Sequence, residues 1–117
     1  MKKNIIFSVL TAIWAGMIAV ISLLPAQAAI TSSLWDKLEH GLAFFVLYAL
    51  MGLGRLARTD LKIWLVAAGY GVVIEFAQLF SPGRYADPFD ALADAIGAFF
   101  GVVAIRLWRQ RRSPNQS

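Results

Sequence analysis

The chain contains no cysteine and a single histidine, and only 15% of its 117 residues are charged. The absence of cysteine excludes disulfides, a thiolate nucleophile and cysteine-bound zinc or iron–sulfur sites, and one histidine argues against a histidine-rich metal site. We therefore expect no metal and no cofactor. About a quarter of the residues of a soluble domain are charged. At 59% apolar residues, this composition fits neither a water-soluble domain nor a disordered chain.

The sequence contains four long apolar stretches. Residues 5–24 contain no charged side chain, and a helix of this length matches a hydrocarbon core about 30 Å thick. Three further stretches, at about 38–56, 63–80 and 89–108, are also long enough to span a membrane. Because backbone polar groups in lipid must be paired within their own segment, we predict an all-α polytopic membrane protein. Its expected form is a four-transmembrane-helix bundle that makes up a single domain over 1–117.

In the predicted four-helix arrangement, nine of the eleven Lys and Arg residues lie on the same side of the membrane. They are Lys2, Lys3, Arg55, Arg58, Lys62, Arg106, Arg109, Arg111 and Arg112. The positive-inside rule then predicts that both the N- and C-termini are cytoplasmic, with a polar tail at 109–117. Membrane lipids with anionic headgroups explain the basic excess, so we expect no nucleic acid among the partners.

The N-terminus also has features of a secretory signal peptide. Lys2 and Lys3 precede the first apolar stretch, and Ala26-Gln27-Ala28 has the small residues of a cleavage site. The apolar region of a signal is usually about 7–15 residues long, which is shorter than the first stretch here. We therefore expect the first helix to be retained, with cleavage after Ala28 left open as the alternative.

Polar residues gather at the outer ends of the predicted spans, where all acidic residues except Asp60 lie. Glu75 and Asp94 share a depth of about 7–8 Å below the outer boundary. An ionised side chain facing lipid there would cost up to a few kcal/mol, so these side chains should turn inward. We therefore predict one ligand-binding cluster. Its members are Asp36, His40, Glu75, Gln78, Arg84, Asp90 and Asp94.

The members of this cluster differ in their expected roles. His40 is best suited to exchange protons near neutral pH and is the candidate catalytic residue. Arg84 is expected to offset the repulsion among the carboxylates, most simply by pairing with Glu75. Lys37 and Glu39 are expected to face lipid headgroups instead. Whether a divalent cation bridges the carboxylates is left open.

One face of the fourth span continues from carboxylates into glycines. Asp90, Asp94, Gly97 and Gly101 recur at i, i+4, i+7 and i+11, which places them on one helical stripe. The Gly97-x-x-x-Gly101 spacing allows two helices to approach closely in lipid. We expect this stripe to pack against another helix, and a homodimer through the same stripe is left open.

These residues resemble the VanZ-like family of small bacterial membrane proteins over about residues 20–105. The matching segments are Ser22-Leu23-Leu24-Pro25, Asp36-Lys37-Leu38-Glu39-His40, Glu75-Phe76-Ala77-Gln78, Gly83-Arg84, Asp90, and Ala95-Ile96-Gly97 through Gly101. The resemblance implies a location in the bacterial cytoplasmic (inner) membrane and an association with low-level teicoplanin resistance, without an established reaction. Two positions depart from the family pattern. Phe44 stands where the family frequently has Tyr, so a hydroxyl is missing there unless Tyr48 supplies it. Asp94 stands where the family frequently has Asn.

Three functions stay open at this point. The one we favour is a module that binds an envelope precursor or other outer-leaflet component, or a glycopeptide-like ligand, through His40, Arg84 and the carboxylates. The alternative is a small membrane enzyme that acts on a lipid-linked headgroup, with His40 as general base, Asp36 or Asp90 orienting it and Arg84 holding phosphate. The third is a proton-coupled carrier or a structural assembly.

Overall fold

The computed structural model describes residues 2–23, 33–55, 57, 59–81 and 88–112. Within these ranges the chain forms four helices and no strand, which confirms the predicted all-α class. The helices are α1 (Lys2–Ser22), α2 (Ser33–Leu53), α3 (Asp60–Gln78) and α4 (Pro88–Arg112). Each begins before its apolar stretch, because the first turn of a helix accepts polar and charged residues.

The starts of α3 and α4 follow from local sequence. Thr59 caps α3 from an extended backbone conformation, and its hydroxyl accepts a hydrogen bond of 3.1 Å from the backbone N–H of Lys62. Pro88 is the first residue of α4, where its missing N–H leaves no donor unpaired.

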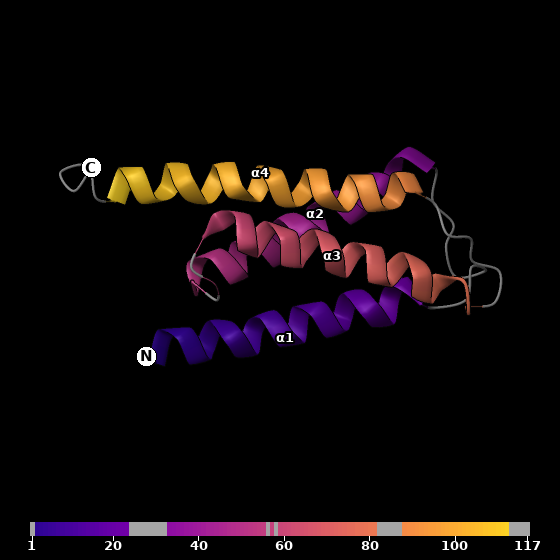
Figure 1. Ribbon diagram of the computed structural model, residues 1–117, viewed down its shortest axis with the longest axis horizontal. Coiled ribbons are helices and arrows are strands. Elements are labelled where there is room, and N and C mark those ends of the chain that lie inside the picture. Colours follow the sequence, from indigo (N-terminus) through magenta and orange to yellow (C-terminus); the bar gives the residue numbers. More distant parts are fainter. Residues whose placement is uncertain (1, 24–32, 56, 58, 82–87, 113–117) are drawn as a thin grey trace.

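Successive helices run in opposite directions along the long axis of the bundle (Figure 1). The start of α1, the end of α2, the start of α3 and the end of α4 therefore share one end, which we call the terminal end. The last turns of α4 run beyond the ends of α2 and α3 there (Figure 1). The remaining helix termini lie at the opposite end.

Helices α2 and α4 form the most closely packed pair. A Cβ at Gly97 would lie 2.1 Å from the carbonyl oxygen of Gly41, and a Cβ at Gly101 would lie 2.9 Å from the Cβ of Tyr48. Neither space admits a side chain, so the glycines allow the two helices to touch closely. This stripe therefore packs against α2 of the same chain.

Helix α1 is fastened to its neighbours by side chains that donate to backbone carbonyl groups. Trp14 Nε1 donates to the Ala43 oxygen of α2 at 2.8 Å, and the Tyr70 hydroxyl of α3 donates to the Ala15 oxygen. Polar tips on large aromatic side chains need such partners in apolar surroundings. These two bonds tie α1 to both α2 and α3.

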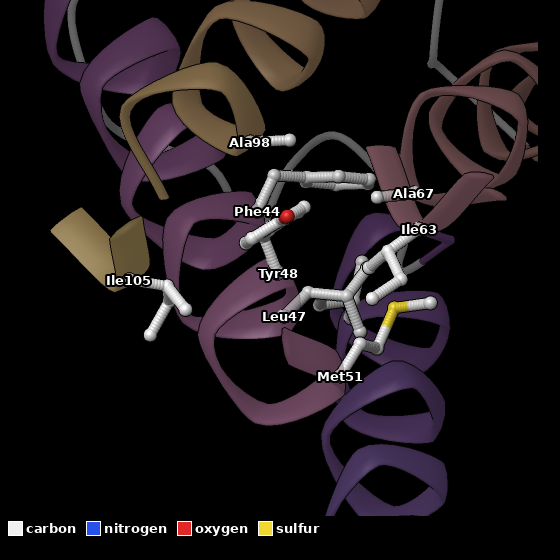
Figure 2. Close-up of a cluster of buried hydrophobic side chains, with 9 residues drawn as sticks. Phe44, Leu47, Tyr48, Met51, Ile63, Ala67, Ala98 and Ile105 are labelled. Atoms are coloured by element: carbon white, nitrogen blue, oxygen red, sulfur yellow. The ribbon is translucent and has the colours of Figure 1, made fainter. Parts of the chain in front are cut away.

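A cluster of buried apolar side chains fills the middle of the bundle, and Figure 2 shows how the side chains of α2, α3 and α4 meet there. Its members are Ile18, Phe44, Leu47, Tyr48, Met51, Ile63, Ala67, Ala98 and Ile105. All four helices contribute, and α2 contributes most. Because Phe44 and Leu47 lie between His40 and Met51 along α2, this core separates the polar groups of the two ends.

The outward-facing surface is also largely apolar, with large exposed aliphatic and aromatic side chains on every helix. Among the described residues, Ile5–Ser22 and Pro88–Arg111 are long and apolar enough to cross a membrane, yet only 11% and 28% of these stretches are buried. A core helix of a soluble protein would be mostly buried. An apolar exterior of this extent is compatible with a membrane protein.

Candidate functional site

A polar array joins α2 to α4 at the opposite end of the bundle. Lys37 Nζ donates to Asp90 Oδ1 at 2.9 Å. His40 Nδ1 lies within hydrogen-bond distance of Asp94 Oδ1, at 2.9 Å, and His40 Nε2 lies 4.0 Å from Asp90 Oδ2. The four side chains therefore form a continuous sequence of charge and hydrogen-bond contacts.

Burial increases along this array. The side chain of Lys37 is 29% exposed, whereas that of Asp94 is completely buried. A buried carboxylate must be compensated by partners, because removing it from water costs several kcal/mol. His40 is one such partner of Asp94.

The contact between glycines explains why these side chains meet. His40 directly precedes Gly41, and Asp94 lies three residues before Gly97, which is one helical turn. Because Gly41 and Gly97 bring the two backbones together, His40 and Asp94 are within hydrogen-bond reach across the same contact. The other pair, Lys37 and Asp90, lies about one helical turn further toward the opposite end.

Helix α3 contributes a third wall. Gly71, Glu75 and Gln78 share one helical face, and a Cβ at Gly71 would lie 2.8 Å from Asp94 Oδ2. The Asp94 carboxylate thus occupies space that a larger residue at position 71 would fill. Glu75 and Gln78 are buried, and Gln78 Nε2 donates to the Ser22 oxygen at 3.0 Å. We call the whole group, made of Lys37, His40, Glu75, Gln78, Asp90 and Asp94, the opposite-end cluster.

Five of the seven ligand-binding residues predicted from the sequence have described side chains, and each is partly or fully buried. They are His40, Glu75, Gln78, Asp90 and Asp94. Arg84 and the side chain of Asp36 lie outside the described residues. The pairing of Arg84 with Glu75 therefore stays a prediction. The side chain that orients His40 through Nδ1 is Asp94, whereas Asp90 lies further away, on the Nε2 side.

One expectation from the sequence, that Lys37 faces headgroups, is wrong, and one open alternative, the role of Tyr48, is resolved. Lys37 does not simply face headgroups, because it binds Asp90, a carboxylate buried deeply enough to need a cation. Its position three residues before His40, on the same helical face, is the signal that could have revealed this contact. Tyr48 does not supply a hydroxyl to the opposite-end cluster, since its hydroxyl donates to Asp60 Oδ1 at 2.9 Å.

A second polar cluster, which the sequence patterns did not predict, lies at the terminal end. Asp60 accepts hydrogen bonds from the Tyr48 hydroxyl at 2.9 Å, Arg106 Nε at 2.8 Å and Arg109 Nη1 at 3.3 Å. Arg109 Nη2 also donates to the Gly52 oxygen at 2.8 Å. We call Tyr48, Asp60, Arg106 and Arg109 the terminal-end cluster. The sequence offered one indication of this cluster, because Asp60 is the one acidic residue on the predicted cytoplasmic side, among the basic residues.

Electrostatics at Asp60 favour the ionised carboxylate. Burial alone would raise its pKa, but the hydrogen bonds from Arg106 and Tyr48 and the charge of Arg109 outweigh burial, so the pKa of Asp60 is lowered. This cluster therefore joins α2, α3 and α4 through one ionised group.

The opposite-end cluster can bind a ligand or position a proton. Its carboxylates and the Gln78 amide offer hydrogen-bond acceptors, and Asp94 orients the His40 imidazole. Among the described residues, no group of three or more His, Cys, Asp or Glu side chains is arranged to hold a metal ion.

Comparison with known proteins identifies the family. No curated protein and no solved structure matches the chain significantly. The sequence matches the VanZ/LLP1 family model over residues 4–109, a range that includes both polar clusters. Since the match covers most of the sequence, the chain belongs to the VanZ/LLP1 family.

Proposed function

We propose that the chain is a multi-pass protein of the bacterial cytoplasmic membrane, in which all four helices cross the bilayer and both termini face the cytoplasm. Apolar side chains on the outward faces of the helices and buried polar side chains between them support this arrangement. Five of the six described Lys and Arg side chains, all except Lys37, also lie at the terminal end, which fits the cytoplasmic side.

Reporter fusions test this topology. A reporter after Arg58 and one at the C-terminus should report the cytoplasm, and one after Tyr85 should report the outside. A C-terminal reporter on the outer face would contradict both the topology and the outer location of the opposite-end cluster.

Helix α1 belongs to this membrane bundle rather than to a removed signal. The bonds of Trp14 and Tyr70 and the bond between Gln78 and Ser22 support its retention. The intact mass of protein extracted from membranes tests this, and a mass that begins after Ala28 would contradict it.

In this topology the opposite-end cluster lies near the outer face, where it binds an envelope component or a glycopeptide-like ligand and alters sensitivity to such antibiotics. The observation that carries the proposal is the array from partly exposed Lys37 to fully buried Asp94. It runs from the surface into the bundle and gives a ligand fixed polar groups inside apolar surroundings.

The charge of the cluster indicates the chemistry of the ligand. Among the described side chains, the cluster contains three carboxyl groups (Glu75, Asp90 and Asp94), one lysine and one histidine, with Lys37 bonded to Asp90 and His40 to Asp94. A ligand that offers hydrogen-bond donors or positive charge to this cluster would complement it. Binding is the leading function because it needs only these groups.

Calorimetric titration of teicoplanin into the full chain in lipid nanodiscs tests binding. Glu75→Gln and Asp90→Asn should each weaken binding about tenfold, the effect of one hydrogen bond to a charged group. Glu39→Gln is the matched control, because Glu39 is exposed on α2 beside His40. Equal losses of affinity in all three variants would mean that only the net charge of the surface matters. That result would contradict a specific binding site.

A second candidate is a small enzyme acting on a lipid-linked headgroup with His40 as general base. The specific observation in its favour is the 2.9 Å contact of His40 Nδ1 with Asp94, which fixes the ring and leaves Nε2 for proton transfer on the Asp90 side. Profiling of headgroups and envelope precursors in cells with and without the protein separates the candidates. An enzyme changes the profile and loses that effect in folded His40→Ala, whereas a binder leaves the profile unchanged.

A further inference from the structure

The described side chains at the terminal end carry a large excess of positive charge. One carboxylate, that of Asp60, is present there among the described residues, against five cations. The cations are Arg55, Lys62, Arg106, Arg109 and Arg111. Neutralising Asp60 uses only part of this charge, so the remainder is available for an anion.

Arg106 and Arg109 bind the same carboxylate in different ways. Arg109 uses Nη1 for Asp60 and Nη2 for the Gly52 oxygen, and its side chain is 29% exposed. Arg106 uses Nε for Asp60, and its side chain is 65% exposed. No other described residue bonds to the two terminal nitrogens of Arg106. Arg109 therefore stabilises the fold, whereas Arg106 presents two donors to the surroundings.

The bond to Asp60 also fixes the orientation of the Arg106 guanidinium. A planar guanidinium with two outward N–H groups matches the oxygens of a phosphate, and prior orientation reduces the entropy lost on binding. Lys62 is exposed in the same first turn of α3 as Asp60, on a different helical face, and adds positive charge to this end of the bundle. The fixed orientation distinguishes the Arg106 guanidinium from the rest of this basic surface.

Apolar neighbours of Arg106 and Lys62 identify the anion as part of a lipid. Leu107 follows Arg106 on α4, Leu61 precedes Lys62 on α3, and both leucine side chains are exposed. A phosphate beside exposed aliphatic surface is the arrangement of a phospholipid at a bilayer boundary, with its acyl chains along the helices. A soluble phosphate would gain nothing from these leucines.

We propose that Arg106, supported by Lys62, binds the phosphate of an anionic phospholipid of the cytoplasmic leaflet. This inference rests on the proposed membrane topology but not on any ligand of the opposite-end cluster. Asp60 acts as a positioning residue, because it holds the guanidinium without touching the lipid.

Native mass spectrometry of the full chain tests the proposal, with equimolar phosphatidylglycerol and phosphatidylcholine in the micelles. The wild type should retain phosphatidylglycerol preferentially. Arg106→Lys keeps the charge but loses the oriented guanidinium, so this preference should fall about tenfold, the loss expected for one hydrogen bond to a charged group. Arg111→Lys is the matched control, because Arg111 is exposed on the same helix without a described carboxylate partner, and it should leave the preference unchanged.

Three results would overturn the proposal. The first is a phosphatidylglycerol preference in Arg106→Lys equal to that of the wild type, and the second is an equal loss of this preference in Arg106→Lys and Arg111→Lys. The third is displacement of the lipid by millimolar glycerol phosphate, which would indicate a site for free anions. Glu75→Gln should retain the phosphatidylglycerol preference, so failure at this site is separable from failure of ligand binding. Release of the wild-type chain from membranes by alkaline carbonate would instead contradict the topology on which both depend.

Discussion

The two polar clusters of this bundle differ in charge balance. In the terminal-end cluster one carboxylate receives donors from a tyrosine and two arginines, and the second arginine also bonds to a backbone carbonyl group. In the opposite-end cluster the described residues include three carboxyl groups, one lysine and one histidine, with Lys37 bonded to Asp90 and His40 to Asp94. The described part of the first cluster is therefore richer in cations, and that of the second is richer in carboxyl groups.

This difference assigns different roles to similar residue types. An ion pair that joins helices fixes their relative positions, and removing one partner leaves the other charge without its counterion. A cluster rich in carboxyl groups is suited to an external partner that offers hydrogen-bond donors or positive charge. We therefore expect substitutions at the terminal end to reduce stability, and conservative ones at the opposite end to reduce function.

The largest effect is expected from Gly97→Ala, which acts on the contact that supports the opposite-end cluster. Its Cβ would lie 2.1 Å from the Gly41 oxygen, so α2 and α4 must move apart. We expect a loss at or above the upper end of the about 1–3 kcal/mol range for overpacking, measured by thermal unfolding in detergent. Gly69→Ala is the control, since no atom lies within 4 Å of its added Cβ. Equal stability of the two variants would contradict the close α2–α4 contact.

Asp60→Asn should have the next largest effect, because it leaves Arg106 and Arg109 without their shared carboxylate. We expect a loss of about 2 kcal/mol, the scale of hydrogen bonds to a charged group. The pKa of Asp60 is lowered in the folded state, so its stabilisation is present above the unfolded pKa of about 4 and is lost as the pH falls through the folded pKa. Unfolding of the wild type measured between pH 7 and pH 2 should show this loss, and Asp60→Asn should lack that component. Identical pH profiles would contradict the role of Asp60.

Trp14→Phe removes one hydrogen bond that lies outside both clusters, and so gives a reference for the effects of substitutions within them. The indole donor to the Ala43 oxygen disappears while an aromatic ring stays in place. Side-chain hydrogen bonds between membrane helices average about 0.6 kcal/mol, so we expect a loss of that size. A loss as large as that of Asp60→Asn would show that α1 contributes as much as the terminal-end cluster.

Glu75→Gln should have the smallest effect on stability. The amide keeps the size of the side chain and one acceptor oxygen, so we expect a change of less than about 1 kcal/mol. The same thermal unfolding measurement decides this. A loss comparable to that of Asp60→Asn would mean that both clusters serve the fold.

Much of this organisation follows from the sequence alone. The apolar stretches predict the four helices, and the spacing of Asp90, Asp94 and the glycines predicts one stripe. The partners of these residues are harder to predict, because periodicity assigns a residue to a face but not to a neighbour across the bundle. Lys37 and Tyr48 show this, since each bonds to a residue on another helix that only the helix packing brings near.

Teicoplanin susceptibility of cells expressing matched amounts of each variant tests the functional distinction most directly. We expect cells with Glu75→Gln or Asp90→Asn to become as susceptible as cells without the protein. Cells with Asp60→Asn, compared at the same amount of folded protein, should keep the wild-type susceptibility. Equal losses in all three variants, or wild-type behaviour of Glu75→Gln and Asp90→Asn, would contradict the proposal that the opposite-end cluster carries the function.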